Sequence, residues 1–373
     1  MVVKVKLRKS NVVLLLMIVF VCFIYYYWRQ TSSLNGIVAY RMLNKNRNQT
    51  LANNQILIYN KYYNIGWKDL FTGEPLFRDN RCIYTTDPDD LMTSEWVLIH
   101  HRDIRKFSDL PQQKFLGQKW ILYNIESPMG NRRWDDMKLF RNIAPHFDIT
   151  MNYRLDSDIP IPYGMIAKNA NETIASFEID FQRKTKQIAW FVSNCESFSR
   201  REEIVEKLGR HIPIDIYGKC GTLICPTGGD HFFKNEACYQ MLSKDYKFYL
   251  SFENSLCIDY VTEKLFNILN YDIIPIVYGG VNYSHILPAN SYIDVRNFSS
   301  SVELASYLNY VGNNEAVYRS YFDWRKDYHV QSDFPNTLCD SILDGNFPHS
   351  NRDIFKWWLD DTCEDLTNCC WTE

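Results

Sequence analysis

The hydrophobic pattern of the chain begins with one long apolar run. Residues 12–28, with the sequence VVLLLMIVFVCFIYYYW, are all apolar or aromatic, and lysines and an arginine precede them. At about 1.5 Å per residue, this run is long enough for a short membrane helix. Its basic flank is expected on the cytosolic side, so the pattern predicts a cytosolic tail over residues 1–11, a transmembrane signal-anchor over residues 12–28 and a lumenal C-terminal bulk.

A cleaved signal peptide is the alternative for the same run. The run is longer than the usual core of a signal peptide, and bulky aromatic residues stand where small residues normally precede a cleavage site. We therefore favour the anchor, whose short length suits the thin bilayer of the early secretory pathway.

After the anchor, the pattern changes from polar to alternating. Residues 29–54 are rich in asparagine and have no lasting apolar period, which is typical of a stem. Apolar runs such as QILIYN, EWVLIHH, KWILYNIES, FDITMNY, KQIAWFVSN, KFYLSFEN and IIPIVYGG then alternate with helical periods such as RREEIVEKLGRH and VELASYLNYV. This alternation predicts an α/β fold with mostly parallel sheets. A polar segment around residue 170 separates two such sets, and we place the domains at 55–170 and 171–373.

The composition argues for a lumenal compartment and against nucleic acid. A formal charge of −3 and a pI near 6.3 give no electrostatic basis for binding nucleic acid. Ten of the eleven cysteines lie outside the anchor, an even number that suits disulfides in an oxidising lumen, with Cys82 and Cys339 as one candidate pair. A zinc site around Cys220 and Cys225 is disfavoured because the chain has no Cys-x-x-Cys.

The candidate glycosylation sites are the four Asn-x-Ser/Thr sequons at Asn48, Asn171, Asn282 and Asn297.

The stretch FYLSFENSLCIDYVTEKLFNILNYDIIPIVYGG, residues 248–280, places polar groups between two apolar strands. A helix over residues 260–270 would bury one stripe and present Tyr260, Glu263 and Lys264 on the opposite face. A lysine close to a helix N-terminus suits a phosphate or diphosphate, whereas a solvated Glu/Lys face is the alternative. The preceding FENS ends a strand with a carboxylate and an amide, which favours binding, since ligands of doubly wound sheets lie at the carboxyl ends of strands.

Three further strand ends carry candidate chemistry. Arg201 opens a helix after a strand that ends at Asn194; an arginine there opposes the helix dipole and predicts a bound anion, unless it pairs with a neighbouring glutamate at the surface. Glu126 follows the strand of KWILYNIES and is placed to act as a general base. Asp156 and Asp158 form an Asp-x-Asp that either holds a divalent metal or makes a turn, and we favour the turn.

Four segments of the chain together resemble one family. FYLSFENSLCIDYVTEKLFNIL, YRLDSDIPIPYG, IESP and YFDWRKDY are similar to motifs of the inverting, GDP-fucose-dependent α1,3-fucosyltransferases of the Golgi, and the anchor and stem match the layout of that family. The segment GKCGTLICPTGGDHFFKNEAC departs from it by its extra cysteines, and the likeness is closer to invertebrate members. The resemblance implies a GT-B fold, in which two Rossmann-like domains face a cleft. The N-terminal domain would hold the acceptor and the C-terminal domain GDP-fucose.

The resemblance also assigns roles to residues. It implies that Glu126 is the general base and that Arg201 and Lys264 bind the diphosphate. Glu263 would lie near sugar or ribose hydroxyls. The remaining residues implied to line the donor pocket are Asn194, Asn254 and Tyr260.

The implied reaction transfers L-fucose to the 3-hydroxyl of a core or antennal GlcNAc on a glycoprotein or glycolipid, in the Golgi lumen, by a single-pass type II membrane protein. No metal is strictly required, although Mn²⁺ or Mg²⁺ can stimulate. A non-catalytic lumenal glycan-binding protein on the same fold and a transferase for another nucleotide sugar are the rival hypotheses.

Overall fold

The computed structural model describes residues 52–60, 81–131, 134–170, 179–225, 236–331, 337–364 and 371. Residues 52–373 belong to one compact unit. The predicted tail and anchor, most of the predicted stem, and the sequons at Asn48 and Asn171 lie outside the described residues. Among the helices that are described, none combines the length and apolar character needed to cross a membrane.

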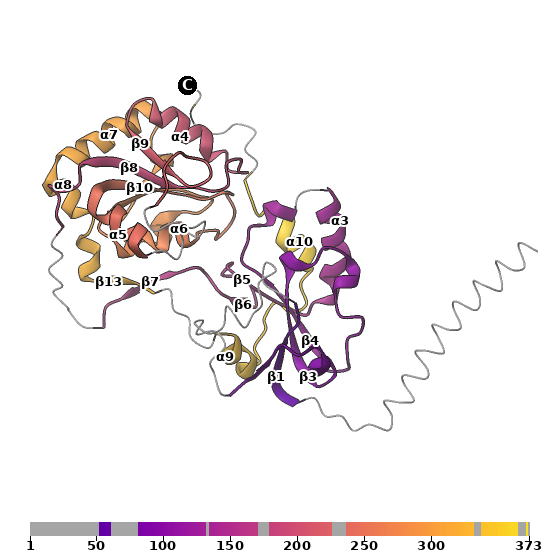
Figure 1. Cartoon of the computed structure of the whole chain (residues 1–373). Coiled ribbons are helices and arrows are strands. Elements are labelled where there is room, and N and C mark those ends of the chain that lie inside the picture. Colours follow the sequence, from indigo (N-terminus) through magenta and orange to yellow (C-terminus); the bar gives the residue numbers. More distant parts are fainter. Residues whose placement is uncertain are drawn as a thin grey trace, which may run out of the picture. The chain divides into compact units, whose positions relative to one another are not determined.

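Among the described residues, the first sheet contains six parallel strands in the order β2-β1-β3-β4-β5-β6. Figure 1 labels β1, β3, β4, β5 and β6 of this sheet. Apolar side chains cover both of its faces, which is why its strands are near-continuous apolar runs. The strands predicted from QILIYN, EWVLIHH, KWILYNIES and FDITMNY are confirmed as β1, β3, β4 and β5. The bounds are β1 Ala52–Ile58, β2 Ile83–Thr85, β3 Ser94–His100, β4 Lys119–Asn124, β5 Ile149–Asn152 and β6 Ile159–Pro160.

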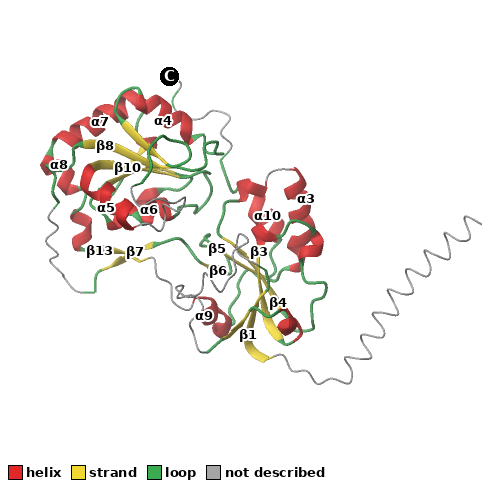
Figure 2. Cartoon of the chain, in the orientation of Figure 1, coloured by secondary structure: helices red, strands yellow, loops and turns green. Residues whose placement is uncertain are grey.

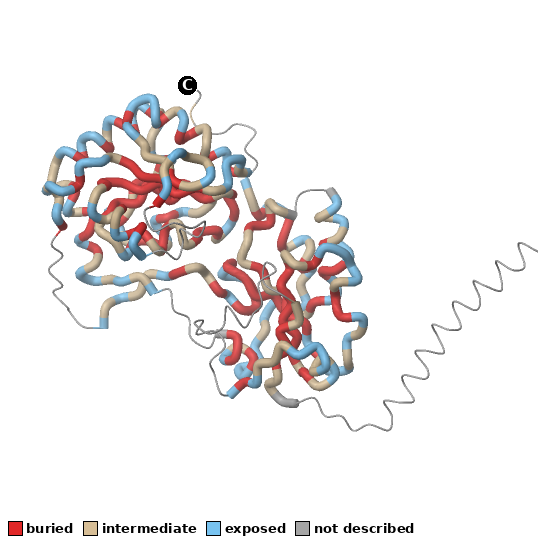
Figure 3. The backbone as a smooth tube through the Cα atoms, in the orientation of Figure 1, coloured by how far each residue is buried: buried red, intermediate tan, exposed pale blue. Residues whose placement is uncertain are grey.

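The second sheet contains five parallel strands in the order β12-β11-β10-β8-β9. Every residue of its central strand β10 is buried. Figure 3 shows the buried segments gathered in the middle of this sheet. The chain runs from β8 outward to β9 and then crosses to β10, so the loops after β8 and β10 leave the sheet at a topological switch point. The bounds are β8 Lys186–Phe191, β9 Ile214–Tyr217, β10 Tyr246–Phe252, β11 Ile274–Tyr278 and β12 Ile293–Asp294.

Helices cover both faces of the second sheet (Figure 2). Helices α4 (Arg201–Gly209), α7 (Ser301–Asn313) and α8 (Glu315–Ser320) pack on one face, and α5 (Glu236–Asp245) on the other. The alternation along β8 explains this, because Ile188 and Trp190 join the first cluster whereas Ala189 and Phe191 join the second. The predicted α/β class is therefore confirmed.

The C-terminal segment returns to the first sheet. Leu338 and Ile342 of α9 (Thr337–Asp344) and Trp358 of α10 (Ile354–Leu359) belong to the clusters that cover that sheet. A two-stranded antiparallel sheet of β7 (Met165–Lys168) and β13 (Tyr328–Gln331) joins segments far apart in the chain. Residues 52–373 are not divided into further compact units, so the domain boundaries 55–170 and 171–373 stay a prediction.

The other described helices are α3 (Trp134–Ile143) and the single turn α6 (Glu263–Phe266). The short 3-10 helices are η2 (Pro88–Met92), η3 (His101–Asp103), η4 (Phe107–Asp109), η5 (Pro128–Asn131), η6 (Ala144–His146), η8 (Ile268–Asn270), η9 (Tyr283–His285), η10 (Val295–Asn297) and η11 (Asp323–Lys326).

Disulfides pair all the cysteines that the structure describes. The predicted pair Cys82–Cys339 is confirmed and ties α9 to the segment at β2. The zinc alternative around Cys220 and Cys225 is wrong, because these residues are bonded to Cys195 and Cys238 respectively. The fourth pair is Cys257–Cys363.

Candidate active site

Glu126 lies where the sequence predicts it, just after β4. The side chain of Asn124 holds this turn: its Oδ1 accepts the Glu126 N–H at 3.1 Å and its Nδ2 donates to the Glu126 carbonyl at 3.2 Å. The Tyr163 hydroxyl donates to the carbonyl of Ile125 at 2.8 Å. The half-buried Glu126 carboxylate accepts a hydrogen bond of 3.2 Å from the hydroxyl of Tyr260, 134 residues along the chain. The tertiary structure thus joins a residue that follows β4 of the first sheet to one that follows β10 of the second.

Tyr260 is a buried and neutral hydrogen-bond donor. It is 1% exposed, and its ring centroid lies 5.0 Å from that of Tyr153. Burial, and then the negative charge of Glu126, raise the pKa of the Tyr260 hydroxyl well above its usual value. The hydroxyl therefore keeps its proton at neutral pH and can hold the Glu126 carboxylate in one orientation.

The helix predicted over residues 260–270 is shorter in the structure, where α6 spans Glu263–Phe266. Asp259 has φ 57° in the left-handed region, and Thr262 is extended and caps a helix that begins only at Glu263. The Thr262 side chain accepts a hydrogen bond from the Lys264 N–H, as a threonine N-cap does. Tyr260 consequently does not share a helical face with Glu263 and Lys264, and its hydroxyl is directed to Glu126 instead.

The carboxylate of FENS lies buried beside Lys264. Glu253, directly after β10, is 0% exposed, and it accepts hydrogen bonds from the Thr262 N–H at 2.8 Å and from the Thr262 hydroxyl at 2.9 Å. The Lys264 Nζ lies 3.4 Å from the Glu253 carboxylate and donates to the Thr262 hydroxyl at 2.8 Å and to Glu263 at 3.2 Å. The signal in the sequence was the Glu of FENS together with a Thr at a helix start, but neither identifies the other as its partner.

Charge and burial oppose each other in this cluster. Burial raises the pKa of the Glu253 carboxyl, although Lys264 and the Thr262 donors act against this rise. Burial lowers the pKa of the Lys264 ammonium, but the carboxylates of Glu263 and Glu253 outweigh it and the net pKa is raised. Lys264 is therefore a cation at neutral pH, and its ammonium is held between two glutamates at the N-terminus of α6.

Arg201 begins α4, as predicted, and its guanidinium is enclosed. Its side chain is 3% exposed and donates to the carbonyls of Phe252 at 2.6 Å and Asn194 at 3.2 Å, so it bridges the ends of β10 and β8. Arg201 also contacts a neighbouring glutamate, Glu202, at 3.5 Å, as the alternative proposed, but its side chain is buried and not at the surface. Its neighbour Arg200 is exposed and pairs with Glu203 at 2.6 Å. The Arg201 guanidinium bonds the carbonyl of Phe252, and the Lys264 ammonium contacts the carboxylate of the next residue, Glu253, so both cations lie at the carboxyl end of β10.

Asn254, directly after Glu253, offers an unpaired acceptor. Its backbone carbonyl accepts from the Ser199 N–H at 3.0 Å, and the Ser199 hydroxyl bonds the carbonyl of Glu253. Its side-chain Oδ1 is buried and has no hydrogen-bond partner among the described residues. A buried polar atom left unpaired is costly, so this oxygen is a position where a ligand hydroxyl or amine would gain a hydrogen bond.

The two aspartates of Asp-x-Asp are bound by protein groups. Asp156 accepts from the Arg154 guanidinium at 2.9 Å and from the Trp357 indole at 2.9 Å. Asp158 accepts from the Thr150 N–H at 2.9 Å and from the His349 N–H at 3.1 Å. These contacts fit the interpretation of Asp156 and Asp158 as part of a turn. That the reaction requires no metal stays a prediction.

Two family models match the chain. One, for the N-terminal part of fucosyltransferases, matches residues 51–164, and the other, described as glycosyltransferase family 10 (fucosyltransferase) C-term, matches residues 181–357. Alpha-(1,3)-fucosyltransferase C of Drosophila melanogaster is 38% identical over 273 residues, which cover 67% of this chain and 61% of that relative. 4-Galactosyl-N-acetylglucosaminide 3-alpha-L-fucosyltransferase 9 of Mus musculus is 38% identical over 266 residues, which cover 70% of this chain and 69% of that relative. The match thus spans less than two thirds of the Drosophila relative.

Solved structures share the fold. A crystal structure of an α1,3-fucosyltransferase with GDP-fucose superposes with a TM-score of 0.51 at 17% identity, covering 79% of this chain and 90% of that one. The same kind of enzyme with GDP gives a TM-score of 0.52 at 17% identity, covering 82% and 95%. At this identity the likeness concerns the arrangement of strands and helices.

Proposed function

This chain belongs to glycosyltransferase family 10, the fucosyltransferases, and from that membership we propose that it transfers L-fucose from GDP-β-L-fucose to the 3-hydroxyl of a GlcNAc residue, with inversion. The observation that carries the proposal is the hydrogen bond between Glu126 and Tyr260, because it joins a carboxylate from the N-terminal family match to the donor-side cluster of the C-terminal match.

In the proposed reaction, Glu126 is the general base. The acceptor oxygen attacks the anomeric carbon of fucose while the Glu126 carboxylate takes the hydroxyl proton. The bond between that carbon and the diphosphate oxygen breaks, and its electron pair leaves with GDP. The Tyr260 hydroxyl orients the carboxylate before the acceptor arrives.

The two cations at the switch point suit the departing diphosphate. Lys264 is held at the N-terminus of α6, and Arg201 lies at the start of α4, so charge that develops on the leaving group meets preorganised positive groups. The Lys264 ammonium would exchange its contact with Glu263 for a phosphate oxygen, which frees Glu263 for donor hydroxyls. We assign Asn194 and Asn254 to the lining of the same donor site.

We further propose a lumenal, membrane-anchored location in the Golgi with type II topology. The support is the apolar run at residues 12–28 with its basic flank, together with the four disulfides found among the described residues, since disulfides form and persist in oxidising compartments. The exposed sequons at Asn282 and Asn297 are available for glycosylation there.

The test is a chain lacking residues 1–50, which leaves β1 complete because β1 begins at Ala52. The expected result is a secreted enzyme that fucosylates N-acetyllactosamine or an N-glycan and ignores the matched acceptor whose GlcNAc lacks its 3-hydroxyl. Product linkage is read by NMR; fucose at any position other than O3 would refute the regiochemistry. Binding of GDP or of the glycan with no transfer at all would support the rival glycan-binding protein.

A further inference from the structure

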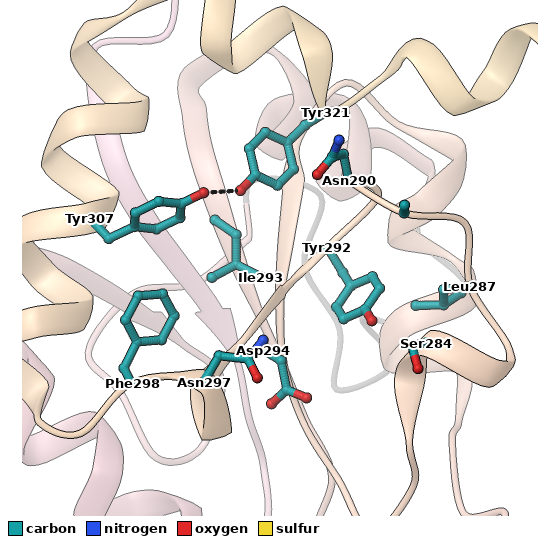
Figure 4. A pocket seen from close by; sticks show the side chains of 11 residues that line it. Ser284, Leu287, Asn290, Tyr292, Ile293, Asp294, Asn297, Phe298, Tyr307 and Tyr321 are labelled. Atoms are coloured by element: carbon teal, nitrogen blue, oxygen red, sulfur yellow. Dashed lines mark hydrogen bonds between the residues drawn. The ribbon is translucent and has the colours of Figure 1, made fainter.

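A cavity of about 450 Å³ opens beside the edge strand β12, between η9, η10 and the helices α7 and α8 (Figure 4). Its volume lies within the range of about 300–1,000 Å³ that is usual for small-molecule sites. None of the residues placed above in the candidate active site lines it. It is therefore a second concave site, separate from the one assigned to fucose transfer.

Aromatic rings form much of the wall, and hydrogen bonding and ring packing fix them. The hydroxyls of Tyr307 and Tyr321 bond each other at 2.6 Å, as the dashed line in Figure 4 shows. The ring centroid of Phe298 lies 5.3 Å from that of Tyr307. Tyr292 packs on the buried Tyr283 at 5.7 Å. Rigid aromatic faces with a polar tip suit the apolar faces of pyranose rings.

Polar groups converge on the same cavity. The Asp294 carboxylate uses one oxygen to cap η10 through the Arg296 N–H at 2.9 Å. Tyr292 and Asp294 both line the cavity, and burial, followed by the charge of Asp294, raises the pKa of the Tyr292 hydroxyl. The side chains of Asn290 and Asn297 are exposed and line the rim. Aromatic walls with a few convergent hydrogen-bonding groups are the usual composition of a ligand site.

One rim residue also identifies a ligand class. Asn297 is the acceptor of the sequon Asn297-Phe298-Ser299, so the residue that would carry an N-glycan lines the cavity, and the next residue forms its wall. The sugar joined directly to asparagine in such a glycan is GlcNAc. We propose that this cavity binds the GlcNAc-GlcNAc unit of an N-glycan. The inference does not rest on the proposed fucosyltransfer.

Two sources can supply this unit. The glycan on Asn297 begins at the rim and would reach the cavity within its own molecule. A glycan on another protein would enter from solution. The chemistry that recognises the sugar is the same in both, and a single substitution, Asn297→Gln, separates them.

The experiment titrates N,N′-diacetylchitobiose into the secreted chain and into its Asn297→Gln variant, with saturation-transfer NMR and calorimetry as readouts. Binding to the variant but not to the glycosylated chain shows that the protein's own glycan fills the cavity. Binding to both shows that the cavity takes glycans in trans. Binding to neither overturns the proposal.

Further variants in the Asn297→Gln background locate the binding. Asp294→Asn keeps an oxygen for the η10 cap but loses the charge, so affinity should fall about tenfold, as for a lost charged hydrogen bond. Tyr292→Ala should abolish the signal, whereas its matched control Tyr292→Phe, which keeps the ring, should retain most of it. Cellobiose, which lacks the acetamido groups, should bind more weakly. Unchanged chitobiose affinity in both Asp294→Asn and Tyr292→Ala would place the sugar elsewhere and refute the cavity. Thermal unfolding of each variant checks that the fold is kept.

Discussion

Replacing Lys264 by methionine should separate folding stability from donor binding. The substitution keeps an unbranched side chain of similar length but removes the ammonium, which lies 3.4 Å from the fully buried Glu253 carboxylate. Removing one partner of a buried pair costs about 3–5 kcal/mol because the other charge is left uncompensated. Since Thr262 still donates two hydrogen bonds to Glu253, we expect the lower end, about 3 kcal/mol of unfolding free energy at pH 7.5.

The loss of unfolding free energy in Lys264→Met should become smaller in acid. Burial raises the pKa of Glu253 in the folded protein, and without Lys264 it rises further. Between the ordinary glutamate value of 4.5 and this raised value, the folded state binds more protons than the unfolded state, so lowering the pH through this window favours the folded state. Guanidinium unfolding at pH 7.5 and pH 5.5 should therefore show a smaller difference from wild type at the lower pH.

Lys264→Met should also weaken the binding of GDP, by a mechanism separate from its effect on stability. Loss of a charged hydrogen bond to phosphate should weaken the affinity by about 1.5–3 kcal/mol, measured by calorimetry. The matched control is Lys264→Met combined with Glu253→Gln, which removes both charges: it should recover most of the stability but none of the GDP affinity. Unchanged unfolding free energy in Lys264→Met at both pH values would refute the buried pair, and unchanged GDP affinity would remove Lys264 from the donor site.

Three further predictions concern the base, the second cation and metal. Glu126→Gln keeps the shape but cannot accept a proton, so turnover should fall by about 10² or more while GDP-fucose binding stays near normal; wild-type turnover would remove Glu126 from the role. Arg201→Ala should weaken GDP binding in calorimetry by about 1.5–3 kcal/mol, and an unchanged affinity would show that the guanidinium only bridges the strand ends. Activity should survive EDTA in part, with Mn²⁺ or Mg²⁺ only stimulating, because in the proposed donor site basic groups and helix ends would neutralise the diphosphate; complete loss rescued by metal would point to Asp156 and Asp158 as ligands.

Local patterns in the sequence determined the elements of this protein. The apolar run of KFYLSF predicts a strand buried on both faces, and β10 is buried at every residue. The end of β4 predicts Glu126 at a strand's carboxyl end, and RREEIVEKL predicts a helix that begins at the arginines, as α4 does. These features depend on side-chain periodicity over a few residues, which any short window of sequence contains.

The tertiary structure decided which of these elements meet. Helical periodicity placed Tyr260 on a face with Lys264, but the left-handed Asp259 and the cap at Thr262 start the helix later and direct Tyr260 to Glu126. The partners of Glu253 depend on the same cap, and the packing of α9 on the first sheet depends on a contact across most of the chain. The contact of Tyr260 with Glu126 and the disulfide that ties α9 to the first sheet join residues more than a hundred positions apart, so they follow from strand order and chain closure and leave no periodic signal in the sequence.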